Sequence, residues 1–292
     1  MNTKTLSEIP EEQMNHKPTI SLNGVNHLGQ WNELNDESKN RWETIADFWD
    51  DYMGNESNRF HRELIKPHTE GLLQIELGHE VLDIACGNGN FSRRLSELGA
   101  NVTAFDYSSK MIERAKLRTN TNSNISYRVI DATDSLALLE LGKGKYDRAV
   151  ANMALMDISD IKPLASSLFE LLKGNGALVF SIPHPCFQTP RMRKIQETED
   201  VNGGLITRNS IQTFEYLTPE PYQAIGIRGQ SVPHYMFHRP LAYYLDIFFA
   251  SGFILDGFVE PSFKKETNVG KFDWFDIPAV SIFRFKKVSR AL

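Results

Sequence analysis

The sequence predicts an α/β fold built on an open, mostly parallel sheet. Apolar runs of strand length alternate with segments of helical periodicity along most of the chain. The run 81–84 breaks into the small residues of 85–90, and a helical pattern, 91–98, follows at once and ends at Gly99. A strand, a small-residue turn and a helix N-terminus together are the usual place for a nucleotide-like cofactor in such a sheet.

Composition places the chain among soluble globular proteins. Its 292 residues are 41% hydrophobic and 24% charged, enough for one large α/β domain with insertions or for one domain with a lid. The formal net charge of −5 argues against a nucleic-acid partner, because phosphate binding usually requires a basic face. Cys86 and Cys186 lie far apart, which favours a reducing compartment over a disulfide framework. With no apolar run of membrane-spanning length and no secretion signal, we expect a cytoplasmic protein without a membrane partner.

The small-residue turn carries the first motif. The letters VLDIACGNGN, residues 81–90, resemble the first motif of class I S-adenosylmethionine-dependent methyltransferases, whose usual form is Asp/Glu-x-Gly-x-Gly-x-Gly. Alanine stands where the first glycine is expected. The alternative is that the two glycines only cap the following helix. The resemblance implies that S-adenosylmethionine is the cofactor and that this turn binds it through Asp83, Ala85, Gly87, Asn88 and Gly89.

Asp106 ends a second predicted strand, 101–106, about twenty residues beyond the glycine turn. In nucleotide-binding α/β folds a carboxylate at this distance accepts hydrogen bonds from the ribose hydroxyls, and its two oxygens suit two neighbouring hydroxyls. The residues that follow resemble the second family motif. This resemblance implies further cofactor contacts at Tyr107 and at Met111, the latter against the adenine. The alternative is that Asp106 caps the next helix.

A third predicted strand, 125–132, also closes on an acidic and a small residue. In the family the corresponding acid receives the adenine amino group, and the next backbone amide serves a ring nitrogen. The resemblance therefore implies these roles for Asp131 and Ala132. A turn-forming aspartate is the alternative, because a second acidic residue, Asp134, follows closely.

The fourth predicted strand and its exit, 146–158, resemble the family segment that passes beside the methionine end of the cofactor. The resemblance implies contacts at Asn152 and Met153. The sequence lacks the Asn/Asp-Pro-Pro-Tyr signature of amino-methylating DNA enzymes, which argues against base methylation. A helix, 161–172, and a fifth strand, 176–182, are predicted next.

The N-terminal segment divides into two parts. Residues 1–30 are polar and lack apolar periodicity, so we expect a flexible arm. Residues 31–75 are predicted to form a helical cap. Its first helix is expected to start with a side-chain cap from Asp36 or Ser38, and its second is interrupted by Pro67.

Part of this cap, RWETIADFWD, resembles the family segment that folds over the cofactor mouth. Aromatic faces there suit a sulfonium cation. We expect Phe60 and His61 to contact the cofactor, and Trp49 and Tyr52 to contact the substrate. The alternative is an amphipathic helix whose aromatic stripe is simply part of the core.

His184 lies between Pro183 and Pro185, directly after the fifth predicted strand. The two prolines exclude a regular helix and present the histidine stiffly at the edge of the sheet where ligands bind. We therefore predict His184 as the catalytic base or substrate-orienting group. The alternative is a histidine that only bonds a neighbouring carbonyl.

Residues from about 187 to 238 leave the expected topology, and we predict that they form a lid inserted after strand 5. Three histidines, His184, His234 and His238, also form a candidate metal set. No carboxylate or cysteine ligand is linked to them in sequence, so we predict no metal. The candidates for contact with the methyl acceptor are Tyr216, Tyr222, His234, Tyr235 and His238.

The C-terminal part predicts a helix from Pro240 to Gly252 and strands at 253–260 and 279–285. These two strands resemble the sixth and the antiparallel seventh strand of the family. The resemblance thus extends from Arg41 to Val288 and implies a doubly wound, seven-stranded, mostly parallel sheet with an antiparallel last strand in a domain from 76 to 292. It implies in-line methyl transfer to a small-molecule acceptor by a monomer or a homodimer.

Two other functions remain open from the sequence. A nicotinamide-dependent oxidoreductase would use Asp106 in a similar way, but it should carry Gly-x-Gly-x-x-Gly in place of the observed turn. A non-catalytic module would keep the S-adenosylmethionine pocket without turnover. The sequence does not identify the methyl acceptor or the atom that is methylated.

Overall fold

The computed structural model describes residues 31–263 and 274–288, so the predicted arm, 1–30, lies outside the described residues. The helices are η3 (Trp31–Leu34), α1 (Asn35–Met53), η4 (His61–Ile65), α2 (Lys66–Leu73), α3 (Asn90–Glu97), α4 (Ser109–Leu117), α5 (Ser135–Leu139), α6 (Lys162–Leu171) and α7 (Leu241–Ala250). The strands are β1 (Glu80–Ile84), β2 (Asn101–Asp106), β3 (Ile125–Val129), β4 (Tyr146–Asn152), β5 (Leu172–Pro183), β6 (Arg193–Val201), β7 (Gly204–Gln212), β8 (Glu220–Ala224), β9 (His234–His238), β10 (Phe253–Val259) and β11 (Val280–Lys287).

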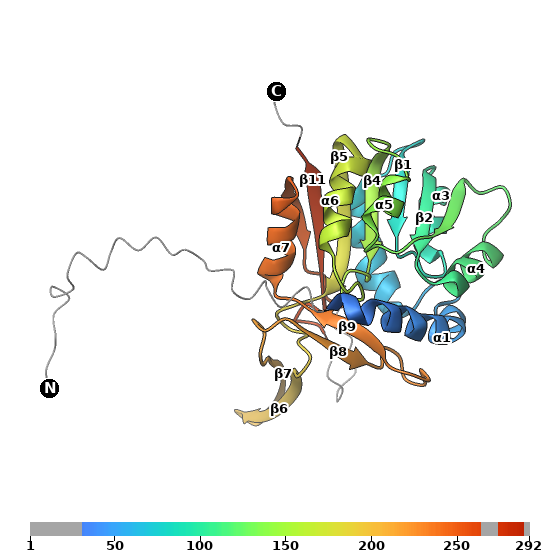
Figure 1. The fold of residues 1–292 in the computed structure, drawn as a ribbon. Coiled ribbons are helices and arrows are strands. Elements are labelled where there is room, and N and C mark those ends of the chain that lie inside the picture. Colours follow the sequence, from blue (N-terminus) through green and yellow to red (C-terminus); the bar gives the residue numbers. More distant parts are fainter. Residues whose placement is uncertain (1–30, 264–273, 289–292) are drawn as a thin grey trace, which may run out of the picture.

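Seven strands form the central sheet in the order β10-β11-β5-β4-β1-β2-β3 (Figure 1). Strands β1 to β5 pair in parallel, whereas β11 runs antiparallel to both β5 and β10. The predicted doubly wound, mostly parallel sheet with an antiparallel last strand is therefore confirmed. The boundaries differ in detail, because β5 begins at Leu172, where the sequence predicted the end of a helix.

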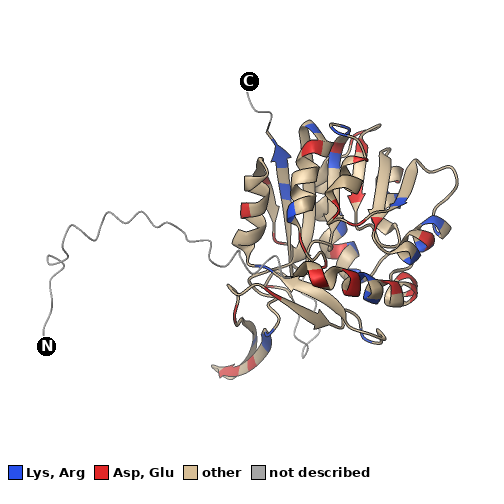
Figure 2. Ribbon diagram, viewed as in Figure 1, with Lys and Arg blue, Asp and Glu red and all other residues tan. Residues whose placement is uncertain are grey.

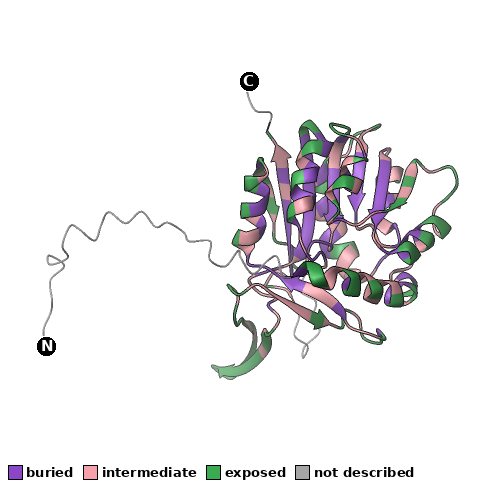
Figure 3. Ribbon diagram, viewed as in Figure 1, coloured by how far each residue is buried: buried purple, intermediate pink, exposed green. Residues whose placement is uncertain are grey.

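Helices cover both faces of the sheet, and this explains why its central strands are almost continuously apolar. On one face, residues of α5, α6 and α7 pack with Phe180 and Phe283 in the larger core cluster. On the other face, Leu73 of α2 and Leu95 of α3 pack against Val81 and Val150. Figure 3 shows the resulting band of buried residues along the central strands.

The chain reverses its winding direction between β1 and β4. These strands are neighbours, yet the chain leaves β1 toward β2 and leaves β4 toward β5 on the other side. The crevice outside the carboxyl ends of the strands at such a switch point is where open α/β sheets bind ligands. In Figure 1 these parallel strands point toward α1, which runs across this edge.

Helix α1 is fixed to α4 by acids on one of its faces. Glu43 accepts hydrogen bonds from the backbone N–H groups of Ser109 (2.6 Å) and Lys110 (3.2 Å), so it caps α4 from a distant part of the chain. Two turns along, Asp50 forms an ion pair with Arg118 at 2.5 Å. The helical cap thus makes specific polar contacts with the sheet domain.

The prediction that a side chain caps the start of α1 is wrong. The 3-10 helix η3 runs directly into α1, whose N-cap position is Leu34 and makes no side-chain cap hydrogen bond. Asp36 and Ser38 lie inside the first turn because the chain is already helical before it reaches them. Pro240, predicted at the opening of the last helix, is the N-cap residue of α7.

Between β5 and α7 the chain forms two antiparallel hairpins, β6–β7 and β8–β9. Hairpin β8–β9 lies against the molecule, and β9 contacts α1. Hairpin β6–β7 projects outward and is mostly exposed on both faces, with acidic residues near its tip and basic residues near its base (Figures 2 and 3). Only the hairpin nearer to α7 therefore covers the switch-point edge.

The turn after β1 contains three residues with positive φ angles: Ala85 (+49°), Gly87 (+52°) and Gly89 (+72°). For alanine this left-handed conformation is unfavourable because Cβ approaches the carbonyl oxygen. Gly89 is required for a second reason, because an added Cβ would clash with Tyr127. The turn therefore stores backbone strain at Ala85, the position that departs from the family motif.

We expect Ala85→Gly to raise the free energy of unfolding by about 0.5–1 kcal/mol, because glycine adopts a positive φ without a steric cost. Urea denaturation followed by circular dichroism measures this change. The matched control is Ala104→Gly in β2, where alanine is buried in an extended strand and glycine should lower the stability. A loss of stability in both variants would contradict the assignment of strain.

Candidate functional site

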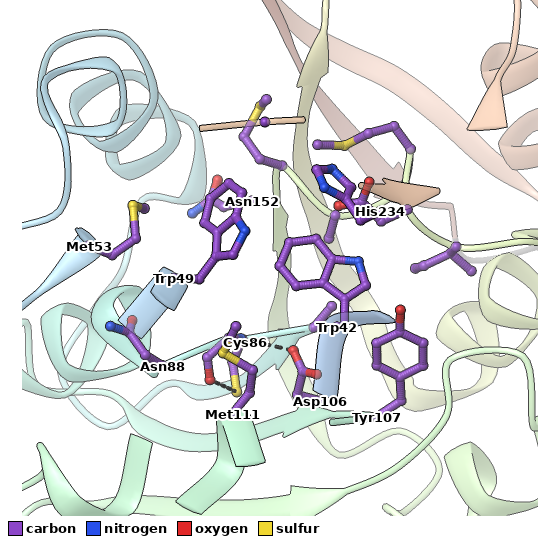
Figure 4. Close-up of a pocket in the computed structure, with 18 of the residues that line it drawn as sticks. Trp42, Trp49, Met53, Cys86, Asn88, Asp106, Tyr107, Met111, Asn152 and His234 are labelled. Atoms are coloured by element: carbon purple, nitrogen blue, oxygen red, sulfur yellow. Dashed lines mark hydrogen bonds between the residues drawn. The ribbon is translucent and has the colours of Figure 1, made fainter. Parts of the chain in front are cut away.

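A cavity of about 610 Å³ opens at the switch-point edge. Its floor is the turn after β1 together with the ends of β2, β3 and β4, and its other walls are α1, the segment 58–61 and the β8–β9 loop. Figure 4 shows residues of α1 and the β8–β9 hairpin on one side, with Cys86, Asp106 and Met111 below them in this view. The cavity therefore lies between the sheet and its two coverings.

Asp106 connects the end of β2 to the glycine turn. Its Oδ2 accepts a hydrogen bond from the Gly87 N–H at 3.0 Å, and its Oδ1 accepts one from the Ser108 N–H at 2.9 Å. Burial raises the pKa of Asp106 to about 6, although the two backbone donors oppose this shift. An added Cβ at Gly87 would meet no atom within 4 Å, so the space above this turn is open.

Asp83 supports the turn from below rather than facing the large cavity. It is buried, and its Oδ2 accepts a hydrogen bond from the Ser92 hydroxyl at 2.5 Å. Burial, together with a smaller contribution from the neighbouring charge of Asp106, raises the pKa of Asp83 to about 7. Gly89, the N-cap residue of α3, also lies outside the cavity lining.

Asp131 lies in the loop after β3 and closes another side of the cavity. Its Oδ1 accepts hydrogen bonds from the backbone N–H and the hydroxyl of Thr133, at 2.8 and 2.7 Å. Its Oδ2 accepts one from Asn35 at the start of α1, at 2.7 Å. The helical cap thus contacts the acid predicted to recognise adenine.

Two tryptophans of α1 and one histidine of β9 form an aromatic group on the lid side. The ring centroids of Trp42 and His234 lie 4.9 Å apart, and those of Trp42 and Trp49 lie 5.3 Å apart (Figure 4). Gln230 holds this group together, since its Oε1 accepts from Trp49 Nε1 at 3.1 Å and its Nε2 lies 3.1 Å from His234 Nδ1.

The same amide fixes the tautomer of His234. Because Gln230 Nε2 also donates to the carbonyl of Val232 at 2.6 Å, it is a donor to His234 Nδ1, which leaves the proton of the neutral ring on Nε2. Burial lowers the pKa of His234 to about 4. His234 is therefore an uncharged N–H donor at neutral pH.

Asp157 lies in the turn after β4 and lines the cavity. Its Oδ1 is buried and has no hydrogen-bond partner among the described residues. Burial raises the pKa of Asp157 well above its usual value; the Asp106 charge adds to this shift and the Arg239 charge opposes it. The turn itself is held by Arg239, whose guanidinium donates to the carbonyls of Leu155, Ile158 and Ser159 at 2.6–2.9 Å.

The structure brings most of the predicted site residues into one cavity, while their individual roles stay predictions. The predicted residues that line it are Trp49, Tyr52, Phe60, His61, Ala85, Gly87, Asn88, Asp106, Tyr107, Met111, Asp131, Ala132, Asn152, Met153 and His234. The predicted residues that do not line it are Asp83, Gly89, His184, Tyr216, Tyr222, Tyr235 and His238.

The three lid tyrosines outside the cavity hold the lid in place. The Tyr216 hydroxyl accepts a hydrogen bond from the Leu241 N–H at the start of α7, at 2.9 Å. Tyr222 donates to the sulfur of Met236 across the β8–β9 hairpin, and Tyr235 donates to Glu37 of α1 at 3.0 Å. Sequence position alone did not distinguish these contacts from contacts with a ligand.

His184 is buried at the end of β5, away from the cavity lining. Its Nδ1 accepts from the Cys186 N–H at 3.2 Å, so its Nε2 carries the proton and donates to Glu260 Oε1 at 2.7 Å. Burial lowers the pKa of His184, and the adjacent Glu260 opposes this shift. Its contacts connect β5 with the segment after β10.

Sequence reasoning missed Trp42 and Asp157 as residues of the cavity wall. Trp42 precedes Trp49 by seven residues, which is two helical turns, so the periodicity of α1 already placed both on one face. Asp157 follows β4 in an irregular turn, and no periodic signal in the sequence showed where its side chain lies.

Comparison with known proteins shows what this fold is similar to. Residues 82–180 match the family model described as "Methyltransferase domain". The chain therefore has the fold of the class I methyltransferases, and this part of it matches a methyltransferase domain. A putative S-adenosylmethionine-dependent methyltransferase of Listeria monocytogenes superposes on the structure with a TM-score of 0.60 and 21% identity, covering 76% of this chain and 97% of that one. An S-adenosylmethionine-dependent methyltransferase of Mesorhizobium loti gives a TM-score of 0.58 and 23% identity over 76% of this chain and 96% of that one.

Curated relatives match about half of this chain, over part of their own length. A malonyl-[acyl-carrier protein] O-methyltransferase of Acetivibrio thermocellus is 27% identical over 176 residues, which are 54% of this chain and 59% of that protein. A ubiquinone biosynthesis O-methyltransferase of Erwinia tasmaniensis is 29% identical over 151 residues, 48% of this chain and 58% of that protein. The matched part thus spans less than two thirds of these relatives.

Within 31–263 and 274–288, no group of three or more His, Cys, Asp or Glu side chains is arranged to hold a metal ion. None of the helices described in these ranges combines the length and the apolar character that a membrane span requires.

We expect a fall in pH to lower the free energy of unfolding of the wild type more than that of the His234→Asn variant. The folded-state pKa of His234, about 4, lies below the unfolded value of 6.5, so the unfolded chain binds the proton more readily. The stability that the neutral ring provides is complete above pH 6.5 and is lost as the pH falls toward 4. Between pH 7 and 4.5 the wild type should lose on the order of 2 kcal/mol more than the variant in urea titrations. Equal losses would show that His234 titrates normally in the folded state.

We expect His184→Ala to lower the free energy of unfolding by about 1–3 kcal/mol, since it removes a buried group with two hydrogen bonds. Calorimetric affinity for S-adenosylhomocysteine should stay within two-fold of the wild type, because His184 does not line the cavity. Glu260→Gln keeps a hydrogen-bond acceptor and should have a smaller effect on stability. If His184→Ala instead loses affinity for S-adenosylhomocysteine while its stability is unchanged, then His184 belongs to the binding site.

Proposed function

We propose that this protein is an S-adenosylmethionine-dependent methyltransferase that acts on a small-molecule acceptor. The position of Asp106 carries this proposal. Its carboxylate ends β2 beside the open turn at Gly87, at the switch point of a sheet with the class I methyltransferase order. The matching family model and the names of the curated relatives support the same activity.

The residues of the cavity fit this cofactor. Asp106 has further lone pairs for ribose hydroxyls beyond the two backbone donors that it already accepts. Asp131 and the Ala132 amide lie on the same wall and suit an adenine edge, while Met111 offers an apolar surface. Asn152 and Met153 lie at the exit of β4, where we place the methionine end. The bound cofactor would supply a methyl group that is already activated by a sulfonium.

The chain itself must position the methyl acceptor and exclude water. The aromatic group formed by Trp42, Trp49 and His234 covers the cavity on the side opposite the glycine turn. Hydrogen bonds from Trp49 Nε1 to Gln230 Oε1 (3.1 Å) and from Arg41 Nη1 to the Pro233 carbonyl (2.8 Å) fix the β8–β9 loop to α1. A covered cavity of this kind favours in-line placement over hydrolysis.

The two other functions weighed from the sequence are less well supported. The sheet order places an antiparallel β11 between β5 and β10, and the matched family is a methyltransferase family, which argues against a nicotinamide-dependent oxidoreductase. A non-catalytic module with the same pocket differs only in turnover. Incubation with isotopically labelled S-adenosylmethionine and a metabolite extract, followed by mass spectrometry for methylated products, distinguishes a methyltransferase from such a module. We further propose a cytoplasmic protein, monomeric or dimeric, without a nucleic-acid partner.

We expect Asp106→Ala to weaken binding of S-adenosylmethionine at least a hundred-fold, because charge-assisted hydrogen bonds to two hydroxyls are lost, each contributing about 1.5–3 kcal/mol. Isothermal titration calorimetry measures the affinity. The matched control is Asp246→Ala on the exposed side of α7, which removes the same charge far from the cavity lining and should bind normally. Unchanged affinity in Asp106→Ala would count decisively against the proposed site.

A further inference from the structure

The cavity contains one carboxylate, that of Asp157, to which the described residues supply no hydrogen-bond donor at Oδ1. Among its described lining residues, the acids are Asp106, Asp131 and Asp157. The first two accept hydrogen bonds from backbone or side-chain donors, as described above. Oδ1 of Asp157 is buried and accepts none among the described residues. Asp157 as a whole is only partly buried and lines the cavity, so the rest of its carboxylate can meet a donor on a bound molecule, which would offset the cost of the unsatisfied oxygen.

Asp157 belongs to the lid side of the cavity. The preceding residue, Met156, accepts a hydrogen bond through its carbonyl from the Phe237 N–H of β9 at 2.6 Å. Strand β9 also carries His234 of the aromatic group. The proposed function assigns Asp106 and Asp131 to the nucleoside, which leaves Asp157 to the methyl acceptor.

The charges around this side of the cavity are complementary to a cation. Arg228 is the only Arg or Lys among the described residues that line the cavity, and it is exposed on the β8–β9 loop. The buried Arg239 directs its Nη groups to backbone carbonyls and forms no hydrogen bond with Asp157. His234 is neutral, and Trp42 and Trp49 offer aromatic faces, which attract cations.

We propose that the methyl acceptor is an amine, which binds as an ammonium ion to Asp157 beside Trp42 and Trp49 and gives its proton to Asp157 before transfer. This proposal rests on the proposed function. In the balanced step, the carboxylate takes one N–H proton and the free amine nitrogen forms a bond to the methyl carbon. The carbon–sulfur bond breaks, its electron pair stays on sulfur, and the products are S-adenosylhomocysteine and the methylated ammonium. Asp157 then returns its proton to water.

The partly buried position of Asp157 distinguishes an amine acceptor from a hydroxyl acceptor. Proton transfer from an ammonium to a carboxylate converts two charges into two neutral groups, which a desolvated site favours. Transfer from a hydroxyl only moves the negative charge and creates an alkoxide or phenolate, which the same site disfavours. Burial also raises the pKa of Asp157, in agreement with a group that accepts a proton from an ammonium.

The test compares two probes that differ only in the functional group, benzylamine and benzyl alcohol. The full-length protein is first titrated with S-adenosylhomocysteine, and each probe is then titrated into the saturated protein at pH 7 by calorimetry. We expect benzylamine to bind at least ten-fold more tightly than benzyl alcohol. Asp157→Asn should abolish this preference, whereas Asp246→Asn, which removes an exposed charge on α7, should retain it.

Mass spectrometry gives a second readout, in which the wild type with labelled S-adenosylmethionine forms N-methylbenzylamine and no benzyl methyl ether. Equal affinity for the two probes, no binding of either, or unchanged amine binding by Asp157→Asn would overturn the inference. If Asp157→Asn does not fold, the comparison of the probes on the wild type still decides. Absence of S-adenosylhomocysteine binding would instead refute the proposed function, so the two failures are distinguishable.

Discussion

The contact between the Asp106 carboxylate and the Gly87 backbone N–H is the constraint on which the site depends. It joins the end of β2 to the turn after β1 at 3.0 Å, and it holds the turn in an open shape with three positive φ angles. An acidic residue buried at this point has a raised pKa and few protein donors. The cost of burying it is the physical reason that this edge of the sheet is suited to a ligand with hydroxyl groups.

Helix α1 turns this sheet edge into a cavity because its faces have different partners. One face carries Glu43, Asp47 and Asp50, which pair with the N-terminus and the arginines of α4. Another presents Trp42 and Trp49 to the cavity and to His234. The N-terminal helix and the inserted hairpin therefore meet over the site, and neither would enclose it without the other.

Local sequence patterns identified the floor of the site because each part of that floor lies at the end of an apolar strand. The turn after β1, Asp106 and Asp131 each follow an apolar strand, and parallel strands bring their carboxyl ends together. The lid was predicted as a segment, but its side chains were not placed. Tyr216, Tyr222 and Tyr235 bond to other parts of the lid, α1 or α7, since their hydroxyl groups find partners that only the folded hairpin provides.

The sequence by itself determined the fold class, the seven-strand topology through family resemblance, and the acids at the strand ends, because these features depend on short-range periodicity and spacing. Only the tertiary structure decided that His184 bonds Glu260 away from the cavity, and that Trp42 and Asp157 reach it. Those placements depend on contacts between segments from 76 to almost 200 residues apart, such as His184 with Glu260 and Tyr235 with Glu37. No local sequence pattern indicates which distant partner a polar side chain will contact in the folded protein.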